Sequence, residues 1–154
     1  MIQRVAILSI LVALVGVSFA AVPAGAASIF WANAVSGVWS DSTNWNPQQV
    51  PGASDFAFIN LAGTYTVTMD EDADILRFSV GASTGTQSLV MDGRVLTISS
   101  ATAATVVLGG VLDMTGGSLL TGSSSLNNLA EVHLDSSQID DGSRFVLDGQ
   151  SMSE

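Results

Sequence analysis

The sequence contains no cysteine and no lysine, and both absences limit what the protein can be. Without cysteine no disulfide framework can hold the fold, so stability must come from apolar burial and backbone hydrogen bonds. Four arginines stand against 14 acidic residues, which gives a net charge of −10. Such a surface repels nucleic acid and anionic lipid headgroups and lacks a basic groove for anionic polysaccharides. We therefore expect no nucleic-acid partner.

The apolar start of the chain predicts an export signal. An almost unbroken apolar run from Val5 to Phe19 follows an arginine and leads to the small residues Ala24-Gly25-Ala26-Ala27. A charged start, an apolar centre and an A-x-A site are typical of a secretory signal peptide, and the run is short for a membrane span of about 20 residues. We predict a signal peptide over residues 1–27, cleaved after Ala26 or Ala27. An uncleaved N-terminal anchor is the alternative.

After cleavage the chain keeps three arginines and all 14 acidic residues, so its net charge becomes −11. We expect it to carry no integral membrane span and to be secreted or displayed on a bacterial cell surface. Its composition is rich in Gly, Ser, Thr, Val, Leu and Asp and poor in strong helix formers, which indicates strands and turns.

Short stretches alternate apolar and polar residues with a period of two, as in Tyr65–Met69 and Leu76–Val80. This alternation indicates half-buried strands rather than helices. The same pattern places further pairs on an inward face: Leu89/Met91, Leu96/Ile98, Val106/Leu108, Leu112/Met114, Val132/Leu134 and Phe145/Leu147. We therefore predict an all-β fold.

Glycine turns and an internal repeat favour strands that stack in parallel. Asp92-Gly93 and Gly109-Gly110 each follow an alternating stretch, and glycine permits the positive φ of a sharp turn. The segment 89–98 matches the segment 106–114, with Leu89 aligned to Val106. Such a spacing is typical of one coil of a parallel β-solenoid (β-helix). An antiparallel β-sandwich is the alternative, because Asp-Gly turns also connect hairpins.

All three tryptophans, Trp31, Trp39 and Trp45, lie before the alternating stretches. We predict that residues 28–62 form a Trp-rich N-terminal cap on solenoid coils that span residues 63–154. An uncapped coil would expose apolar interior and strand edges, and each indole can bury about 150–250 Å². A sugar-stacking platform is the alternative role for these indoles. The polar tail shows no matching cap, so a truncated chain is a further alternative.

The sequence predicts no metal site. The acidic cluster (Asp70, Glu71, Asp72 and Asp74) has the D-x-D-x-D spacing that opens a calcium loop. The sixth position is Ile75 instead of glycine, however, and the twelfth is Gly81 instead of glutamate. We expect a solvated acidic turn, and the same at Asp140-Asp141, because charge runs usually mark solvated faces.

The sequence also predicts no catalytic residue and no cofactor. His133 is the only histidine and falls at an outward position, where it has no second histidine or cysteine to complete a metal site. No serine lies in a G-x-S-x-G elbow, and no glycine-rich phosphate loop is present. Paired carboxylates of a glycosidase or lyase would need a longer groove than so few coils provide.

The tryptophans belong to a longer ordered set of motifs. In chain order these are Phe30-Trp31, Gly37-Val38-Trp39-Ser40-Asp41, Asn44-Trp45-Asn46, Val50-Pro51-Gly52-Ala53-Ser54-Asp55 and Gly63-Thr64-Tyr65-Thr66-Val67-Thr68. This order resembles the N-terminal stretch of bacterial autotransporter-associated β-strand repeat proteins and related PEP-CTERM-type exported proteins. The resemblance spans about residues 28–122.

The resemblance implies a right-handed parallel β-helix that is secreted or surface-exposed and often adhesive. We expect surface glycans or other surface proteins as partners. No apolar sorting helix follows in the sequence, so the chain resembles a short or truncated member. We expect a structural or adhesion protein without catalytic activity; the alternative is a carbohydrate-binding or polysaccharide-cleaving β-helix fragment.

Overall fold

The computed structural model describes residues 25–100, 104–116, 118–122, 125–128, 131–134, 138–139 and 144–147. Residues 1–24 of the predicted signal peptide, Asp140-Asp141 and the C-terminal tail lie outside this part of the chain. The described residues form strands and turns, with a single 3-10 turn at Ser42–Asn44 (η1) and no α-helix. Within them no helix is long and apolar enough to cross a membrane. The prediction of an all-β protein is confirmed.

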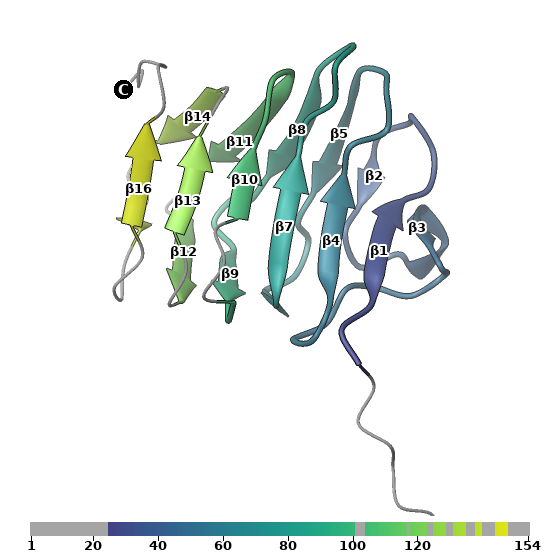
Figure 1. Ribbon diagram of the computed structural model, residues 1–154, viewed down its shortest axis with the longest axis horizontal. Coiled ribbons are helices and arrows are strands. Elements are labelled where there is room, and N and C mark those ends of the chain that lie inside the picture. Colours follow the sequence, from purple (N-terminus) through teal and green to yellow (C-terminus); the bar gives the residue numbers. More distant parts are fainter. Residues whose placement is uncertain are drawn as a thin grey trace, which may run out of the picture.

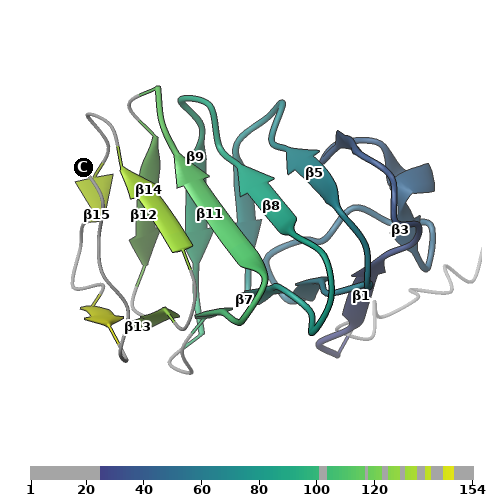
Figure 2. The same ribbon diagram turned by 90° about the horizontal axis from the view of Figure 1, so that it is seen from above.

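The strands form three sheets that run along the long axis of the molecule (Figures 1 and 2). The first sheet has the order β16 (Arg144–Leu147), β13 (Ser125–Asn128), β10 (Ala104–Val106), β7 (Arg77–Val80), β4 (Phe56–Ile59), β1 (Ser28–Trp31) and β3 (Trp45–Asn46). The second has the order β14 (Glu131–Leu134), β11 (Gly110–Met114), β8 (Gln87–Val90), β5 (Tyr65–Thr68) and β2 (Gly37–Val38). The third has the order β15 (Gln138–Ile139), β12 (Leu119–Gly122), β9 (Val95–Ile98) and β6 (Ala73–Ile75).

From β4 onward each sheet takes every third strand, so the chain visits the three sheets in turn. Neighbouring strands are parallel, as between β5 and β8 and between β8 and β11. The short pair of β1 with β3 is the antiparallel exception among the described strands. This parallel pairing rules out the alternative of an antiparallel sandwich for the described part of the chain.

Alternation along each strand produces one shared core. In β5 the side chains of Tyr65 and Val67 are buried, whereas Thr66 and Thr68 are half-buried on the opposite face. The parallel register then places the buried side chains of neighbouring strands beside one another. One column of the second sheet runs Val67, Leu89, Leu112, Val132, and all four side chains are buried. Each such side chain contributes about 1.5–3 kcal/mol through burial.

The alternation predicts that Leu108 and Leu76 face the core, and both predictions are wrong. Leu108 is 72% exposed, because β10 ends at Val106 and the chain turns where the Gly110 N–H donates to the Val107 carbonyl at 2.7 Å. Leu76 is only half-buried, because it lies at the bend between β6 and β7. A local period of two does not reveal where a strand stops and a turn begins.

The predicted repeat is also wrong, because it is too short. The sequence match aligns Leu89 with Val106, but in the sheet Leu89 lies beside Leu112. Val106 belongs to β10, a strand of the first sheet, whereas Leu89 belongs to β8 of the second. Both strands are followed by a glycine turn, so their local patterns look alike. The step from one strand to its neighbour in the same sheet is therefore longer than the match indicates.

Successive turns approach each other so closely that glycine is required at Gly85. Its φ is +79°, a conformation that L side chains rarely adopt, and a Cβ there would overlap the backbone of Gly63 in the preceding turn. The buried side chain of Gln87 holds these turns together. Its amide donates to the carbonyls of Gly63 and Thr84 and accepts from the Ala82 N–H at 2.6 Å.

The predicted boundary between cap and coils, residues 62 and 63, falls inside a continuous structure. β4 pairs with β7 along its whole length, so the first sheet passes through both regions. Figure 1 shows β1, β2 and β3 together at one end of the molecule. The tryptophans belong to this end, because Trp31 lies in β1, Trp45 in β3 and Trp39 next to β2.

Candidate functional site

The three tryptophans form a buried cluster and not an open platform. Trp31, Trp39 and Trp45 are 3%, 0% and 1% exposed. The ring of Trp45 meets Trp31 edge-to-face at 5.0 Å between centroids and Trp39 at 4.9 Å. Trp31 also stacks with Tyr65 at 6.5 Å. Because no indole face is open to solvent, these rings cannot provide a sugar-stacking surface.

Hydrogen bonds orient two of these indoles. The Trp31 Nε1–H donates to the Val35 carbonyl at 3.0 Å, and the Trp45 Nε1–H donates to the Trp39 carbonyl at 2.8 Å. The Nε1–H of Trp39 is buried without a partner among the described residues. The cluster is therefore held by apolar burial and edge-to-face contact at the end of the molecule that contains β1, β2 and β3.

Three members of the acidic cluster lie on the turn from β5 into β6 and the fourth, Asp74, lies in β6 itself; part of the cluster has a structural role. Asp70 accepts hydrogen bonds from the Ser40 N–H (3.0 Å) and the Ser40 hydroxyl (2.6 Å), and Asp72 accepts from the Val95 N–H at 2.9 Å. The Ser40 hydroxyl contributes most to lowering the pKa of Asp70 below its usual value. These carboxylates tie neighbouring segments together on the surface.

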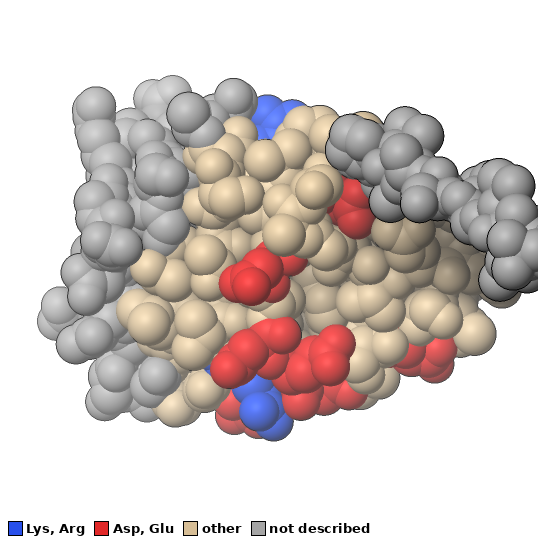
Figure 3. Space-filling view, turned by 90° about the horizontal axis from the view of Figure 1, so that it is seen from below, with Lys and Arg blue, Asp and Glu red and all other residues tan. Residues whose placement is uncertain are grey.

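Asp41 behaves in a similar way nearby. Its carboxylate accepts from the Thr43 hydroxyl at 2.7 Å and from the Thr43 N–H at 2.9 Å, and these bonds lower the pKa of Asp41. Figure 3 shows acidic side chains gathered on one face of the molecule beside a basic one. In the described part of the chain no three acidic, histidine or cysteine side chains come together as a metal site. The arrangement is that of a solvated acidic surface.

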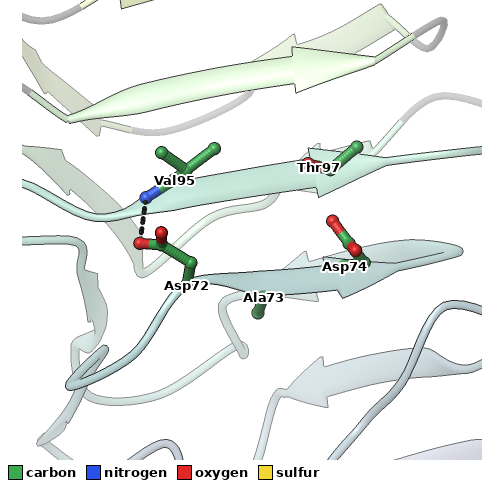
Figure 4. Close-up of a pocket in the computed structure, with 5 residues that line it drawn as sticks. All are labelled: Asp72, Ala73, Asp74, Val95 and Thr97. Atoms are coloured by element: carbon green, nitrogen blue, oxygen red, sulfur yellow. Dashed lines mark hydrogen bonds between the residues drawn. The ribbon is translucent and has the colours of Figure 1, made fainter.

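A shallow hollow lies beside the acidic cluster, on the outer face of the third sheet (Figure 4). It is lined by Asp72, Ala73, Asp74, Val95 and Thr97 and has a volume of about 240 Å³. This volume is below the roughly 300–1,000 Å³ of ordinary ligand pockets. Figure 4 shows the bond from the Val95 N–H to Asp72, which occupies one of the two carboxylates. The hollow presents two carboxylates and the hydroxyl of Thr97 to solvent.

His133 lies on β14, on the face away from the core, as predicted from its position beside the buried Val132. Its imidazole is 40% exposed and lies 2.7 Å from the carboxylate of Glu131. The register places Asp113 beside it on β11. An exposed imidazole paired with a carboxylate two residues away is an ordinary surface contact, and no serine among the described residues bonds to it.

A strip of outward-facing aromatic rings, one exposed and two half-buried, lies on the outer face of the first sheet and was missed by sequence reasoning. Phe30 is 41% exposed and stacks on Phe58 of the next strand at 4.9 Å, with the rings 16° apart. The Arg77 guanidinium lies over the ring of Phe56 at 4.9 Å. The signal was available, because β4 reads Phe-Ala-Phe-Ile with both phenylalanines outward and Ala57 inward. We call Phe30, Phe56, Phe58 and Arg77 the aromatic strip.

No protein-family model, no curated protein and no solved structure matches this chain.

Proposed function

We propose that the chain is a right-handed parallel β-helix, exported from a bacterial cell, which serves as a structural or adhesion-type element outside the cell without catalysis. The observation that carries the proposal is that, from β4 onward, every third strand stacks in parallel register in the same one of three sheets. Stacked coils give a rigid rod whose backbone groups pair along its axis, and such rods present long surfaces to partners.

The right-handed sense of the coils follows from a general rule. A strand, a crossover and a parallel strand in the same sheet are right-handed in about 98% of cases. Each step from β4 to β7 or from β5 to β8 is such a crossover. The buried tryptophan cluster supports the role of an N-terminal cap, because it covers apolar interior at the end where β3 and β2 are the edge strands of the first and second sheets.

The surface favours contact with partners that are neither nucleic acid nor anionic lipid. The chain carries a net charge of −10 and no lysine, so it repels polyanions. Apolar contact is available on the aromatic strip, where Phe30 and Phe58 form a stacked pair. Surface glycans and other surface proteins fit this combination, because both can pack uncharged faces on exposed rings.

Carbohydrate binding is the second candidate, and the aromatic strip is the observation that favours it. Flat rings beside an arginine are suited to stack on a sugar while the guanidinium donates to its hydroxyls. This role would belong to the strip and not to the buried tryptophans, so changing Trp39 or Trp45 would test only the fold.

One experiment separates the two. The exported chain is purified, incubated with neutral polysaccharides in a reducing-sugar assay, and applied to a glycan array. The non-catalytic proposal expects no sugar release, and steady release above a blank would overturn it. Saturable glycan binding that falls at least tenfold in Phe58→Ser, but not in the matched outward variant Ser79→Ala, would establish the second candidate.

A further inference from the structure

Asp55 is the one charged side chain that the described part of the structure buries, with 7% of its surface exposed. It directly precedes β4. Its Oδ2 accepts from the Gly52 N–H at 3.0 Å and from the Gln49 side-chain amide at 3.2 Å, and its Oδ1 accepts from the Ala27 N–H at 3.2 Å. All three donors are neutral, and no described basic side chain forms an ion pair with this carboxylate. A buried carboxylate without a cation is costly.

Among the described residues, which begin at Gly25, contacts of the N-terminal segment with the folded body begin at Ala27. Its carbonyl accepts from the Phe56 N–H at 2.8 Å, and its side chain packs against the core. Gly25 and Ala26 are exposed, and a Cβ added at Gly25 would meet nothing within 4 Å. The boundary between exposed chain and packed chain therefore falls at the bond between Ala26 and Ala27.

This boundary coincides with one of the two cleavage sites that the sequence predicts. Cleavage after Ala27 would remove both of its hydrogen bonds. Cleavage after Ala26 keeps the bond to Phe56 and turns the amide that faces Asp55 into a free amino terminus. We propose that a leader peptidase hydrolyses the Ala26–Ala27 bond and that the new α-ammonium of Ala27 forms a buried ion pair with Asp55. The inference rests on the export that forms part of the proposed function.

The chemistry of this step is a plain hydrolysis. Water adds across the Ala26–Ala27 amide, its hydroxyl goes to the carbonyl carbon of Ala26, and the C–N bond breaks. The leader leaves as a carboxylate, and the nitrogen of Ala27 leaves as an amine that takes up a proton at neutral pH. One buried carboxylate thereby gains one cation at hydrogen-bond distance, in a charge-assisted bond stronger than the amide donor it replaces.

As a consequence, the fold gains this stabilisation only after the leader is removed. The nearby charged residue is Arg77 of β7, whose backbone N–H donates to the backbone carbonyl of Asp55 at 3.4 Å while its guanidinium lies over Phe56. Arginine keeps its charge throughout the accessible pH range. A free α-amino group titrates near pH 8, and a carboxylate partner raises its pKa in the folded state. The stabilisation is therefore complete below about pH 8 and is lost as the pH rises through the raised value.

The first test is the site of cleavage. The full chain with its own leader is expressed in a bacterium, and the exported product is analysed by intact mass and N-terminal sequencing. The inference expects a chain that begins at Ala27. An exported chain that begins at Ser28 or elsewhere would overturn the inference but not export. An uncleaved chain that stays inside the cell would overturn both.

The second test uses the absence of lysine, which makes the α-amino group the one primary amine of a chain that begins at Ala27. An amine-reactive ester should label the native protein at pH 8 at least tenfold more slowly than the unfolded protein. Replacing Asp55→Asn should remove much of this protection. Equal rates in native and unfolded protein would overturn the ion pair, and the comparison needs no refolding.

Acetylation of the same amine removes its charge, whereas reductive dimethylation keeps it. After either reaction in denaturant and refolding, the acetylated chain should melt about 3–6 °C below the dimethylated chain at pH 7. This difference should shrink above about pH 10, where the unmodified and methylated amines lose their protons. Equal melting temperatures of the two modified chains at pH 7 would contradict the proposal. The charge of the amine would then have no effect on stability, and the size of the added group would account for any change.

Discussion

The two ends of the described core bury their apolar surface in different ways. Around β1, β2 and β3, three indoles and Tyr65 meet edge-to-face or stacked, and indole N–H groups bond to specific carbonyls. From β8 onward the buried apolar side chains of the described residues are aliphatic or methionine, in columns such as Leu89 on Leu112 that repeat in register from one strand to the next.

This difference shows that stacking and ending a stack are separate physical problems. Stacking needs only inward apolar residues and turns that fit over one another, so many sequences can satisfy it. An end has no neighbour to supply apolar contact or backbone partners, so large side chains must be placed individually. We therefore expect substitutions at the tryptophan end to cost more than equivalent ones within the columns.

The largest effect is expected for Trp45→Ala. It removes a fully buried ring from contact with two other indoles and leaves the Trp39 carbonyl without its donor, at a cost of about 4–5 kcal/mol. Trp45→Phe keeps most of the ring and should cost about half as much. Urea denaturation followed by far-ultraviolet circular dichroism measures both. A loss of less than about 1 kcal/mol in Trp45→Ala would mean that the indole does not close the stack.

The next effect concerns the turns between strands. Gly85→Ala forces a positive φ on alanine and places a Cβ against the backbone of Gly63, so we expect a loss of about 3 kcal/mol. Gly52→Ala is the matched control, because its nearest neighbour would be Asp55 Oδ2 at an ordinary 3.6 Å. It should change stability by less than about 0.5 kcal/mol. Similar losses in the two variants would argue against the close approach of successive turns.

A smaller effect is expected inside a column of the third sheet. Ile98 is 2% exposed and lies in register beside Ile75, so Ile98→Val removes one buried methylene at a cost of about 1 kcal/mol. Thr97→Val on the opposite face should be neutral within about 0.5 kcal/mol. Thermal and urea unfolding of the unmodified protein and the two variants would check this ranking. A larger loss of stability in Thr97→Val than in Ile98→Val would mean that Thr97, and not Ile98, faces the core.

The smallest effect is expected at the surface of the tryptophan end. The pKa of Asp70 is lowered chiefly by the Ser40 hydroxyl, so its stabilisation is complete above about pH 4 and is lost as the pH falls through the lowered value. Asp70→Asn should lower the melting temperature at pH 7 by less than about 2 °C, because exposed charges contribute little. The difference should disappear near pH 2. A difference that persists there would assign the effect to packing.

Much of the strand content could be predicted from the sequence, because inward residues such as Met69, Met91 and Met114 alternate with polar ones and are buried in the structure. The repeat length could not. The step along the chain from Phe56 to its partner Arg77 is shorter than the step from Ser79 to its partner Thr105, because the turns differ in length. Local alternation does not indicate which sheet a strand joins.

The surface features were harder still to predict. In β4 the large rings of Phe56 and Phe58 point outward and the small Ala57 points inward, which is the reverse of what side-chain size alone would predict. Only the position of β4 in the sheet shows which face is inward. Asp55 was visible as part of a motif, but its contact with Ala27 joins two segments that are far apart in the sequence. Neither feature has a local sequence signature.

The parallel register is the claim on which the account depends, and the cysteine-free chain allows it to be tested by engineered disulfides. Thr66 pairs with Ser88 and Thr68 pairs with Val90 on the outer face of the second sheet, where neighbouring Cα atoms lie about 4.8 Å apart, within disulfide range. Both double variants, T66C/S88C and T68C/V90C, should form an intramolecular disulfide on mild oxidation. If the strands ran antiparallel, only one pair could lie side by side, so a bridge in one variant and none in the other would contradict the account.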